Sequence, residues 1–332
     1  MKRTRTMLKN IAKAQNIFFF ILALFLMLVI STLYYLALPF KSEAVVFVPQ
    51  GSIREIIANL ANENAKMSKI DLFALRILGS PQAGWIDIGE GKLNRGEFLH
   101  KLTRAKAALV GVTLIPGETT AVFFRQLAAK FDFDENKLWD EYKKRAKYDE
   151  GMFYPDTYHL PKNIKEEDLI KILLRYSELA LKNLSHFYTG EYNEQKWREV
   201  IIRASVIQKE AAANDEMPII ASVIKNRLKI GMKLQMDGTL NYGLYSHSKI
   251  TPERIRNDNS GYNTYKIEGL PKEAVCNVSR NAIDAVINPA KTDYLYFMRD
   301  KSTCKADGTG CRHIFTTNAA EHNKAVDSQR GR

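Results

Sequence analysis

The sequence contains few cysteines, prolines and glycines, and this excludes several classes of protein. Only three of the 332 residues are cysteine, too few for a disulfide-stapled scaffold or a cysteine-rich zinc framework. Ten prolines and 18 glycines exclude collagen-like and low-complexity architectures. Hydrophobic residues make up 45% of the chain and charged residues 26%, which excludes a mainly disordered protein. The chain is therefore expected to fold, as one large or two modest domains.

Common catalytic and nucleotide-binding motifs are also missing. The sequence has no Gly-x-Ser-x-Gly, no Walker loop, no His-Glu-x-x-His and no Gly-x-Gly-x-x-Gly. Its six histidines are scattered, so we expect no metal site and no cofactor. No basic stripe is interleaved with aromatic residues, so nucleic acid is not an expected partner. Carboxylates remain the candidates for catalysis.

The first 40 residues contain no acid and one long apolar run. In residues 17–38, a run of 22 residues, only Ser31 and Thr32 are not apolar or aromatic. A helix of this length spans about 33 Å, enough for a bilayer core of about 30 Å. A cleaved signal peptide is the alternative, but its apolar region usually has about 7–15 residues and ends at a small-x-small site. This run is longer and ends in tyrosines and proline, which favours a retained transmembrane helix.

The charges around this run predict its orientation. Residues 1–16 carry five cations and are expected in the cytoplasm by the positive-inside rule. Everything from about Lys41 onward is then extracytoplasmic, most simply in the periplasm of a bacterium, with one pass through the inner membrane. In that oxidising compartment Cys304 and Cys311 could form a disulfide, which would stabilise the fold by about 2.5 kcal/mol. The sequence leaves a disulfide and two free thiols equally open. Cys276 would stay unpaired.

Hydrophobic periodicity predicts an α+β ectodomain in two parts. Residues 43–111 form a small α+β module with strand patterns at 45–49 and 85–88, and nothing in it is typical of a catalytic site. Residues 112–330 form the larger part. Its predicted elements are a strand at 112–115, helices at 120–130, 134–147 and 194–210, a helix capped by Asp215 and ended by Gly231, a strand-and-loop segment at 231–243, a helix at 279–287, a hairpin of 294–298 with 313–315, and a closing helix at 321–326.

Glu210 is the strongest acid–base candidate. It ends a mostly apolar helical pattern, and three alanines follow it. Burial beside apolar side chains raises the pKa of a carboxyl, which suits a general acid near neutral pH. The alternative is an ordinary surface glutamate at a helix end. Two more acids, Glu150 and Asp156, lie in or beside an aromatic-rich linker, and they suit a turn as well as a sugar-binding platform.

The segment after Gly231 offers polar groups suited to a polysaccharide groove. Five residues supply amide, carboxyl and hydroxyl groups within eight positions: Gln235, Asp237, Thr239, Asn241 and Tyr242. Structural turn chemistry explains some of these residue types equally well.

Seven segments occur in an order typical of one protein family. They are 150–158 (EGMFYPDTY), 204–210 (ASVIQKE), 223–237 (VIKNRLKIGMKLQMD), 262–265 (YNTY), 269–271 (GLP), 289–297 (PAKTDYLYF) and 321–323 (EHN). The ordered set resembles the YceG-like (MltG) endolytic murein transglycosylases. That family carries one transmembrane helix and a LysM-like subdomain. The resemblance therefore implies that residues 43–111 are LysM-like and that residues 112–330 are the catalytic domain.

The resemblance also implies an activity. It predicts a lyase that cuts peptidoglycan glycan strands internally, between MurNAc and GlcNAc, leaves a 1,6-anhydroMurNAc end, and so terminates glycan polymerisation. The family's catalytic glutamate corresponds to Glu210, which would act as general acid and then as base. The residues expected to stabilise the oxocarbenium-like charge are Gln235, Asn263 and Tyr265. The further expected substrate contacts are Asp237, Thr239, Tyr242, Asn226, Glu150 and Asp156.

The chain departs from the family pattern at several positions. Ala211 and Gly238 stand where the family usually has threonine and proline, Val278-Ser279 replaces a Pro-Gly, and the Cys304–Cys311 segment is not a family feature. Ala211 removes a possible hydrogen-bond partner of Glu210.

Two other functions stay open. One is a hydrolase, in which water replaces the sugar's C6 hydroxyl. The other is a non-catalytic, membrane-anchored, peptidoglycan-binding scaffold for cell-wall synthases. The expected partners are glycan strands, the cell membrane and these synthases.

Overall fold

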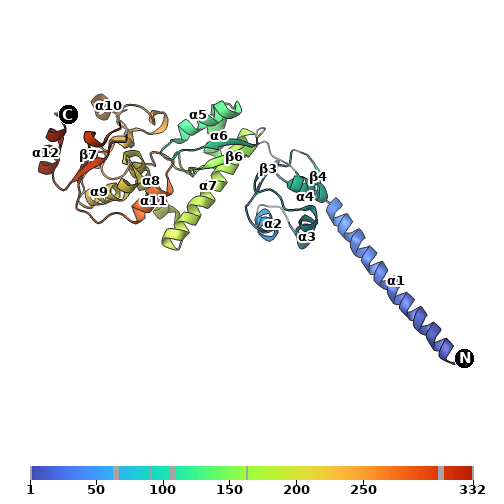
Figure 1. Ribbon diagram of the computed structural model, residues 1–332. Coiled ribbons are helices and arrows are strands. Elements are labelled where there is room, and N and C mark those ends of the chain that lie inside the picture. The colour runs from blue at the N-terminus through green and yellow to red at the C-terminus, as the bar shows by residue number, and fades with distance from the viewer. Residues whose placement is uncertain are drawn as a thin grey trace. The chain divides into compact units, whose positions relative to one another are not determined.

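Figure 1 shows a computed structural model of the chain. The structure describes residues 2–62, 67–89, 91–104, 109–161, 164–305 and 310–330. The chain divides into two compact units, one formed by residues 1–110 and 159–162 and the other by residues 111–158 and 163–332. Both units mix helices with short strands, so the prediction of a mixed helix-and-sheet protein is confirmed.

The first helix, α1 (Lys2–Ala37), contains the predicted apolar run. Its segment Gln15–Ala37 has 23 residues and a mean hydropathy of 2.7, which is long and apolar enough to cross a membrane. The phenylalanines and leucines of this segment are largely exposed, whereas those of a soluble core helix would be buried. A helix exposed and apolar on all sides is suited to a lipid environment.

The rest of the first unit is a small α+β module with an apolar core. Its elements are β1 (Pro39–Phe40), β2 (Val45–Val48), α2 (Ile53–Asn62), α3 (Lys69–Leu78), β3 (Gly84–Asp87), β4 (Leu93–Asn94) and α4 (Arg95–Arg104). β1 pairs with β4 and β2 pairs with β3, both antiparallel. Val48, Leu75 and Leu99 are fully buried in its core.

A buried carboxylate ties α1 to this module. Asp71 of α3 is 0% exposed, and its Oδ2 lies 2.8 Å from Nη1 of Arg95. The same oxygen accepts hydrogen bonds from the backbone N–H of Ser68 (2.7 Å) and from the hydroxyl of Tyr35 (3.0 Å). Because a buried charge is costly without partners, these contacts fix the end of α1 against α3 and α4.

The second unit is mainly helical. Its helices are α5 (Thr120–Phe131), α6 (Glu135–Arg145), α7 (Glu166–Thr189), α8 (Glu194–Glu210), α9 (Met217–Lys229), α10 (Pro252–Asn257), α11 (Arg280–Ile287) and α12 (Ala319–Arg330), with 3₁₀ turns η1 (Asn214–Glu216), η2 (Asp237–Leu240), η3 (Gly243–Tyr245) and η4 (Lys301–Thr303). β7 (Tyr296–Arg299) and β8 (His313–Thr316) form an antiparallel hairpin. A further two-stranded sheet pairs β5 (Leu109–Thr113) with β6 (Thr157–Pro161).

Helix α8 is central to this unit because its apolar positions face α9 and α11. Asn193 begins it, accepting a 3.1 Å hydrogen bond at its side chain from the backbone N–H of Lys196. Ile201 and Ile207 are buried in a core shared with Ile220 and Ile283. This packing fixes the position of the helix's last residue, Glu210.

Three features of this unit differ from the sequence predictions. Asp215 does not cap α9, because Glu216 is the preceding residue and Asp215 instead forms a 2.7 Å ion pair with Arg312. Residues 231–243 contain no strand and form loops around η2, with Gln235 in a left-handed conformation at φ 46°. The long helix α7 was not among the predicted elements, although it buries several leucines and isoleucines.

Candidate active site

A cavity of about 600 Å³ lies in the second unit at the C-terminal end of α8. Five of the residues singled out from the sequence line it: Glu210, Gln235, Asp237, Tyr265 and Asn241. The other lining residues are Lys209, Arg227, Gly238, Ser248, Lys249, Ile250, Phe297, Met298, Arg299 and His313. The cavity is thus built from the end of α8, the loops on either side of η2, the 262–265 segment and the β7–β8 hairpin.

Glu210 is half-buried and titrates near neutral pH. Burial raises the pKa of its carboxyl to about 7, and the nearby charge of Asp237 acts in the same direction. Glu210 also sits at the carbonyl end of α8, where the helix dipole disfavours a negative charge. A hydrogen bond from the backbone of Gly238 and the cations Arg299 and Arg227 oppose this rise. A carboxyl with such a pKa can both give and take a proton near pH 7.

Gly238 approaches Glu210 so closely that only glycine fits there. Its backbone N–H donates a 2.7 Å hydrogen bond to Oε1 of Glu210. A Cβ on Gly238 would lie 2.8 Å from that oxygen and 2.8 Å from Cβ of Lys209. The close approach therefore orients the carboxyl of Glu210.

Asp237 and Tyr265, two other residues of the lining, are joined by a hydrogen bond. The Tyr265 hydroxyl donates a 2.6 Å hydrogen bond to Oδ1 of Asp237. Burial and the neighbouring carboxylates raise the pKa of Tyr265 well above its usual range, so this hydroxyl stays protonated. Gln235 is held by its backbone N–H, which donates to the carbonyl of Thr264 at 3.1 Å, while its side chain is exposed at the cavity.

Thr239 and Asn263, which were predicted to contact substrate, are not among the residues that line the cavity. Both side chains are fully buried. Thr239 donates its hydroxyl to the carbonyl of Met236 at 2.7 Å, and Asn263 donates its amide to the carbonyls of Ile255 and Asp258 at 2.8 and 2.7 Å. Their hydrogen-bonding groups shape the loops that carry Asp237 and Tyr265.

Tyr242 and Asn226 are also outside the cavity lining. Tyr242 stacks on Tyr262 with ring centroids 4.3 Å apart, and its hydroxyl donates to Asp258 at 3.0 Å. The Asn226 amide donates to the carbonyls of Thr292 and Tyr294 at 2.8 and 3.0 Å. Asn226 thereby fastens α9 to the segment that enters β7.

Glu150 and Asp156 likewise have structural partners. Glu150 is buried and accepts hydrogen bonds from the backbone N–H of Thr120 (2.9 Å) and its hydroxyl (2.6 Å), so it caps α5. Burial raises the pKa of Glu150 to about 7. Asp156 accepts from the hydroxyl of Tyr176 and from the backbone N–H of Thr157.

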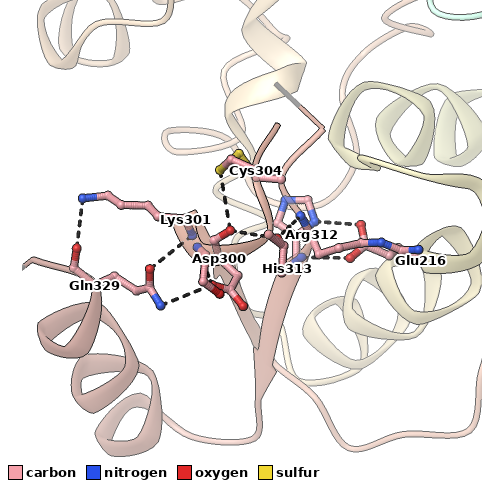
Figure 2. The surroundings of a disulfide bond; sticks show 10 residues. Glu216, Asp300, Lys301, Cys304, Arg312, His313 and Gln329 are labelled. Atoms are coloured by element: carbon pink, nitrogen blue, oxygen red, sulfur yellow. Dashed lines mark hydrogen bonds and ion pairs between the residues drawn. A yellow bond between two sulfur atoms is a disulfide. The ribbon is translucent and has the colours of Figure 1, made fainter. Parts of the chain in front are cut away.

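The β7–β8 hairpin is held in place by contacts in its connecting loop and at the start of β8. Figure 2 shows the disulfide between Cys304 and Cys311, which resolves the two alternatives left open by the sequence. Beside it, Gln329 of α12 accepts a 3.1 Å hydrogen bond from the backbone N–H of Lys301. Where β8 begins, next to this loop, the backbone N–H of His313 donates to Glu216 at 2.8 Å, and its Nδ1 lies 3.1 Å from the same carboxylate.

Sequence reasoning missed the cationic part of the lining. Lys209 and Arg227 lie inside the family-like segments, so the resemblance could have drawn attention to them. Lys249 and Arg299 lie outside those segments and carry no local signal. Among the residues that the structure describes, no group of three or more histidine, cysteine, aspartate or glutamate side chains could hold a metal ion.

Comparison with known proteins gives consistent results. An endolytic murein transglycosylase of Bacillus subtilis is 28% identical over 320 residues, 86% of this chain and 85% of that protein. An endolytic murein transglycosylase of Streptococcus pneumoniae is 32% identical over 182 residues, 52% of this chain and 32% of its own length. These relatives are lytic transglycosylases, which are lyases.

Fold comparison agrees with the sequence comparison. A crystal structure of a YceG-like protein from Listeria monocytogenes superposes with a TM-score of 0.53 at 24% identity, over 84% of this chain and 97% of that one. The sequence profile of the YceG-like family matches residues 46–328, which include every residue that lines the cavity. The resemblance seen in the sequence is therefore confirmed, and the chain belongs to the YceG-like family.

Proposed function

We propose that this protein is an endolytic transglycosylase that cleaves peptidoglycan glycan strands between MurNAc and GlcNAc and leaves 1,6-anhydroMurNAc ends. Glu210 carries the proposal: a carboxyl with a pKa of about 7, held by Gly238 at the edge of a cavity of about 600 Å³. A cavity of this size accommodates a sugar and part of its neighbour.

In the first step, protonated Glu210 gives its proton to the glycosidic oxygen as the bond to C1 breaks. The raised pKa keeps a large fraction of this carboxyl protonated at neutral pH, as a general acid requires. Positive charge then develops on the muramyl ring. Asp237, held by Tyr265, and the amide of Gln235 are the groups we assign to stabilise it.

In the second step, the ionised Glu210 takes the proton of the muramyl C6 hydroxyl while that oxygen closes on C1. One carboxyl serves both steps because the nucleophile belongs to the sugar and no water has to be activated. The N–H of Gly238 stabilises the carboxylate formed between the two steps.

Hydrolysis is the second candidate, because Asp237 is another carboxylate in the same cavity. In a two-carboxylate hydrolase it would activate water. Its Oδ1 is occupied by the Tyr265 hydroxyl, which suits a fixed charge better than a base. The products differ in mass, since an anhydro end is one water lighter than a reducing end.

The test is digestion of uncrosslinked glycan strands by the full-length chain in detergent, with the products identified by mass spectrometry. Wild type should release anhydro-ended fragments, and Glu210→Gln should reduce the rate by roughly 10²–10⁴-fold. Glu199→Gln, an exposed acid on the same helix, is the matched control and should retain the rate. Fragments with reducing ends would replace this proposal by the hydrolase.

We further propose how the chain is arranged in the cell. Residues 1–16 lie in the cytoplasm, residues 17–38 span the inner membrane, residues 43–111 form a LysM-like module, and residues 112–330 form the periplasmic catalytic domain. The support is the cation-rich segment before the apolar helix and the compact α+β module after it. Fusion of a reporter active only in the periplasm to residue 332 tests this orientation.

In this position the enzyme would cut strands as they leave the membrane and so terminate their growth. Cells that carry Glu210→Gln should accumulate longer glycan strands. Under the alternative of a non-catalytic scaffold for synthases, the same substitution would leave strand length unchanged.

A further inference from the structure

Cations outnumber acids on the cavity lining. Lys209, Arg227, Lys249 and Arg299 contribute positive charge, whereas Glu210 and Asp237 are the only acids among the described lining residues. Because the pKa of Glu210 is raised to about 7, its charge is only partly present at neutral pH. The cavity is therefore electropositive, and a cleft of one sign concentrates ligands of the other sign.

Two of these cations are already engaged by the protein. Arg227 is buried, and its guanidinium donates to the carbonyl of Leu295 at 2.6 Å and to the carbonyl of Leu234. The Lys209 ammonium donates to the hydroxyl of Ser246 at 2.9 Å. Both side chains thus hold parts of the fold together.

Lys249 and Arg299 differ from this pair. Both are exposed and line the cavity, and within the described part of the chain neither side chain forms a hydrogen bond or an ion pair. Arg299 is close enough to Glu210 to favour the charged form of that carboxyl. A cation that lines a substrate cavity without a protein partner is available to a ligand.

Arg299 is also held on a rigid support. It is the last residue of β7 and lies directly across the hairpin from His313, whose ring and backbone N–H are both bonded to Glu216. The next residue, Asp300, donates its backbone N–H to the carbonyl of Arg312 at 2.7 Å, and the Cys304–Cys311 disulfide closes the loop beyond (Figure 2). Only the side chain of Arg299 therefore has to be ordered when it binds a ligand.

The proposed substrate offers one kind of anion. The glycan backbone is neutral, and the carboxylates of a strand lie on the arm attached to O3 of the muramyl residue: the lactyl carboxylate when that arm is bare, or the carboxylates of the stem peptide when it is substituted. A guanidinium pairs with such a group through two parallel hydrogen bonds.

We infer that Arg299 and Lys249 form a carboxylate-binding subsite that recognises the O3 arm of the muramyl residue and selects strands on which that arm is anionic. This inference relies on the proposed function for the identity of the polymer. It adds a specificity determinant, separate from Glu210, to the lining of the same cavity.

The test measures binding, so that it does not depend on turnover. Full-length protein carrying Glu210→Gln is titrated in detergent with labelled, uncrosslinked strands of three kinds: stems with free carboxylates, stems capped as methylamides, and strands freed of stems by an amidase. Capping should weaken binding roughly three- to tenfold, and added salt should reduce this difference.

Substitutions assign the effect to these residues. In the same background, Arg299→Gln with Lys249→Gln should abolish the discrimination against capped strands, and Arg299→Lys should retain part of it. Lys291→Gln, which removes an exposed cation outside the cavity lining, should retain all of it. Stem-free strands that bind as tightly as uncapped ones show that the subsite also accepts the lactyl carboxylate, and weak binding restricts it to the carboxylates of the stem.

Equal binding of free and capped strands would overturn the inference, as would a loss of discrimination in Lys291→Gln. Failure of the proposed function would look different. Protein that retains Glu210 would then discriminate by charge in the binding assay and yet release no anhydro-ended product.

Discussion

The backbone N–H of Gly238 donates a 2.7 Å hydrogen bond to Oε1 of Glu210. This contact favours the charged carboxylate, whereas burial favours the neutral acid, and their balance places the pKa at about 7. Ala211 has no hydrogen-bonding side chain, and the hydrogen bond to Glu210 that the structure shows comes from the amide of Gly238.

Gly238→Ala should impair the site without unfolding the protein. A Cβ would lie 2.8 Å from Oε1 of Glu210 and 3.0 Å from the backbone carbon of Lys209, so the loop or the carboxyl must move. We expect a loss of about 1–3 kcal/mol in the free energy of unfolding, together with a fall in kcat. Thermal unfolding and initial rates of strand cleavage measure the two effects. An unchanged rate for Gly238→Ala would contradict the assigned role of this contact.

The pH dependence of cleavage should be one-sided. The reactive form of Glu210 is the protonated one, and its pKa is raised to about 7. The value of kcat/KM should therefore be constant at low pH and fall about tenfold per pH unit above pH 7. A bell-shaped profile, with a second ionisation on the acid side, would instead support Asp237 as a base and hence the hydrolase.

Glu150 should affect stability and leave catalysis alone. It caps α5 through Thr120 and lies outside the cavity lining. Its folded pKa is raised to about 7, so its protonated form stabilises the fold below about pH 4.5 and this contribution is lost as the pH rises to 7. From pH 5 to pH 8 the stability of wild type relative to Glu150→Gln should fall by on the order of 2–3 kcal/mol.

Denaturant unfolding at the two pH values measures this change. A parallel shift of wild type and Glu150→Gln would exclude Glu150 as the titrating group.

Reduction of the Cys304–Cys311 disulfide should loosen the hairpin. The chain-entropy relation gives about 2.5 kcal/mol for a loop of this size. Unfolding with and without reductant measures the loss, and strand binding should weaken as well because Arg299 and His313 flank the loop. The double variant Cys304→Ser/Cys311→Ser should not respond to reductant. A response of that variant would point to the third cysteine, Cys276.

Much of the fold is predictable from local pattern. The boundaries of α8 and the hairpin partnership of β7 with β8 follow from apolar periodicity, since each element buries one face. Asp215 does not cap α9 because it lies inside η1, the turn before the helix, and its carboxylate pairs with Arg312, 97 residues along the chain. Long-range ion pairs of this kind leave no local signal.

The residues of the candidate site also differ in how far the sequence predicts their positions. Glu210 could be found from its apolar helix, and Asp237, Gln235 and Tyr265 from the family-like segments. Thr239 and Asn263 belong to the same segments, yet their side chains turn inward to satisfy buried carbonyls. A sequence motif records that a residue is needed and does not separate a contact to substrate from a contact that shapes the loop.

The Cys304–Cys311 disulfide makes the folding of the β7–β8 hairpin depend on the compartment in which the protein is found. Disulfides persist in oxidising compartments and are reduced in the cytosol. On the proposed topology, a newly made copy forms the Cys304–Cys311 bond only after translocation. That bond closes the loop of the β7–β8 hairpin, which carries Arg299 in the cavity lining. Copies that have not yet been exported would lack this disulfide and would bind glycan strands weakly. Full affinity would then arise only in the periplasm, where the glycan strands are.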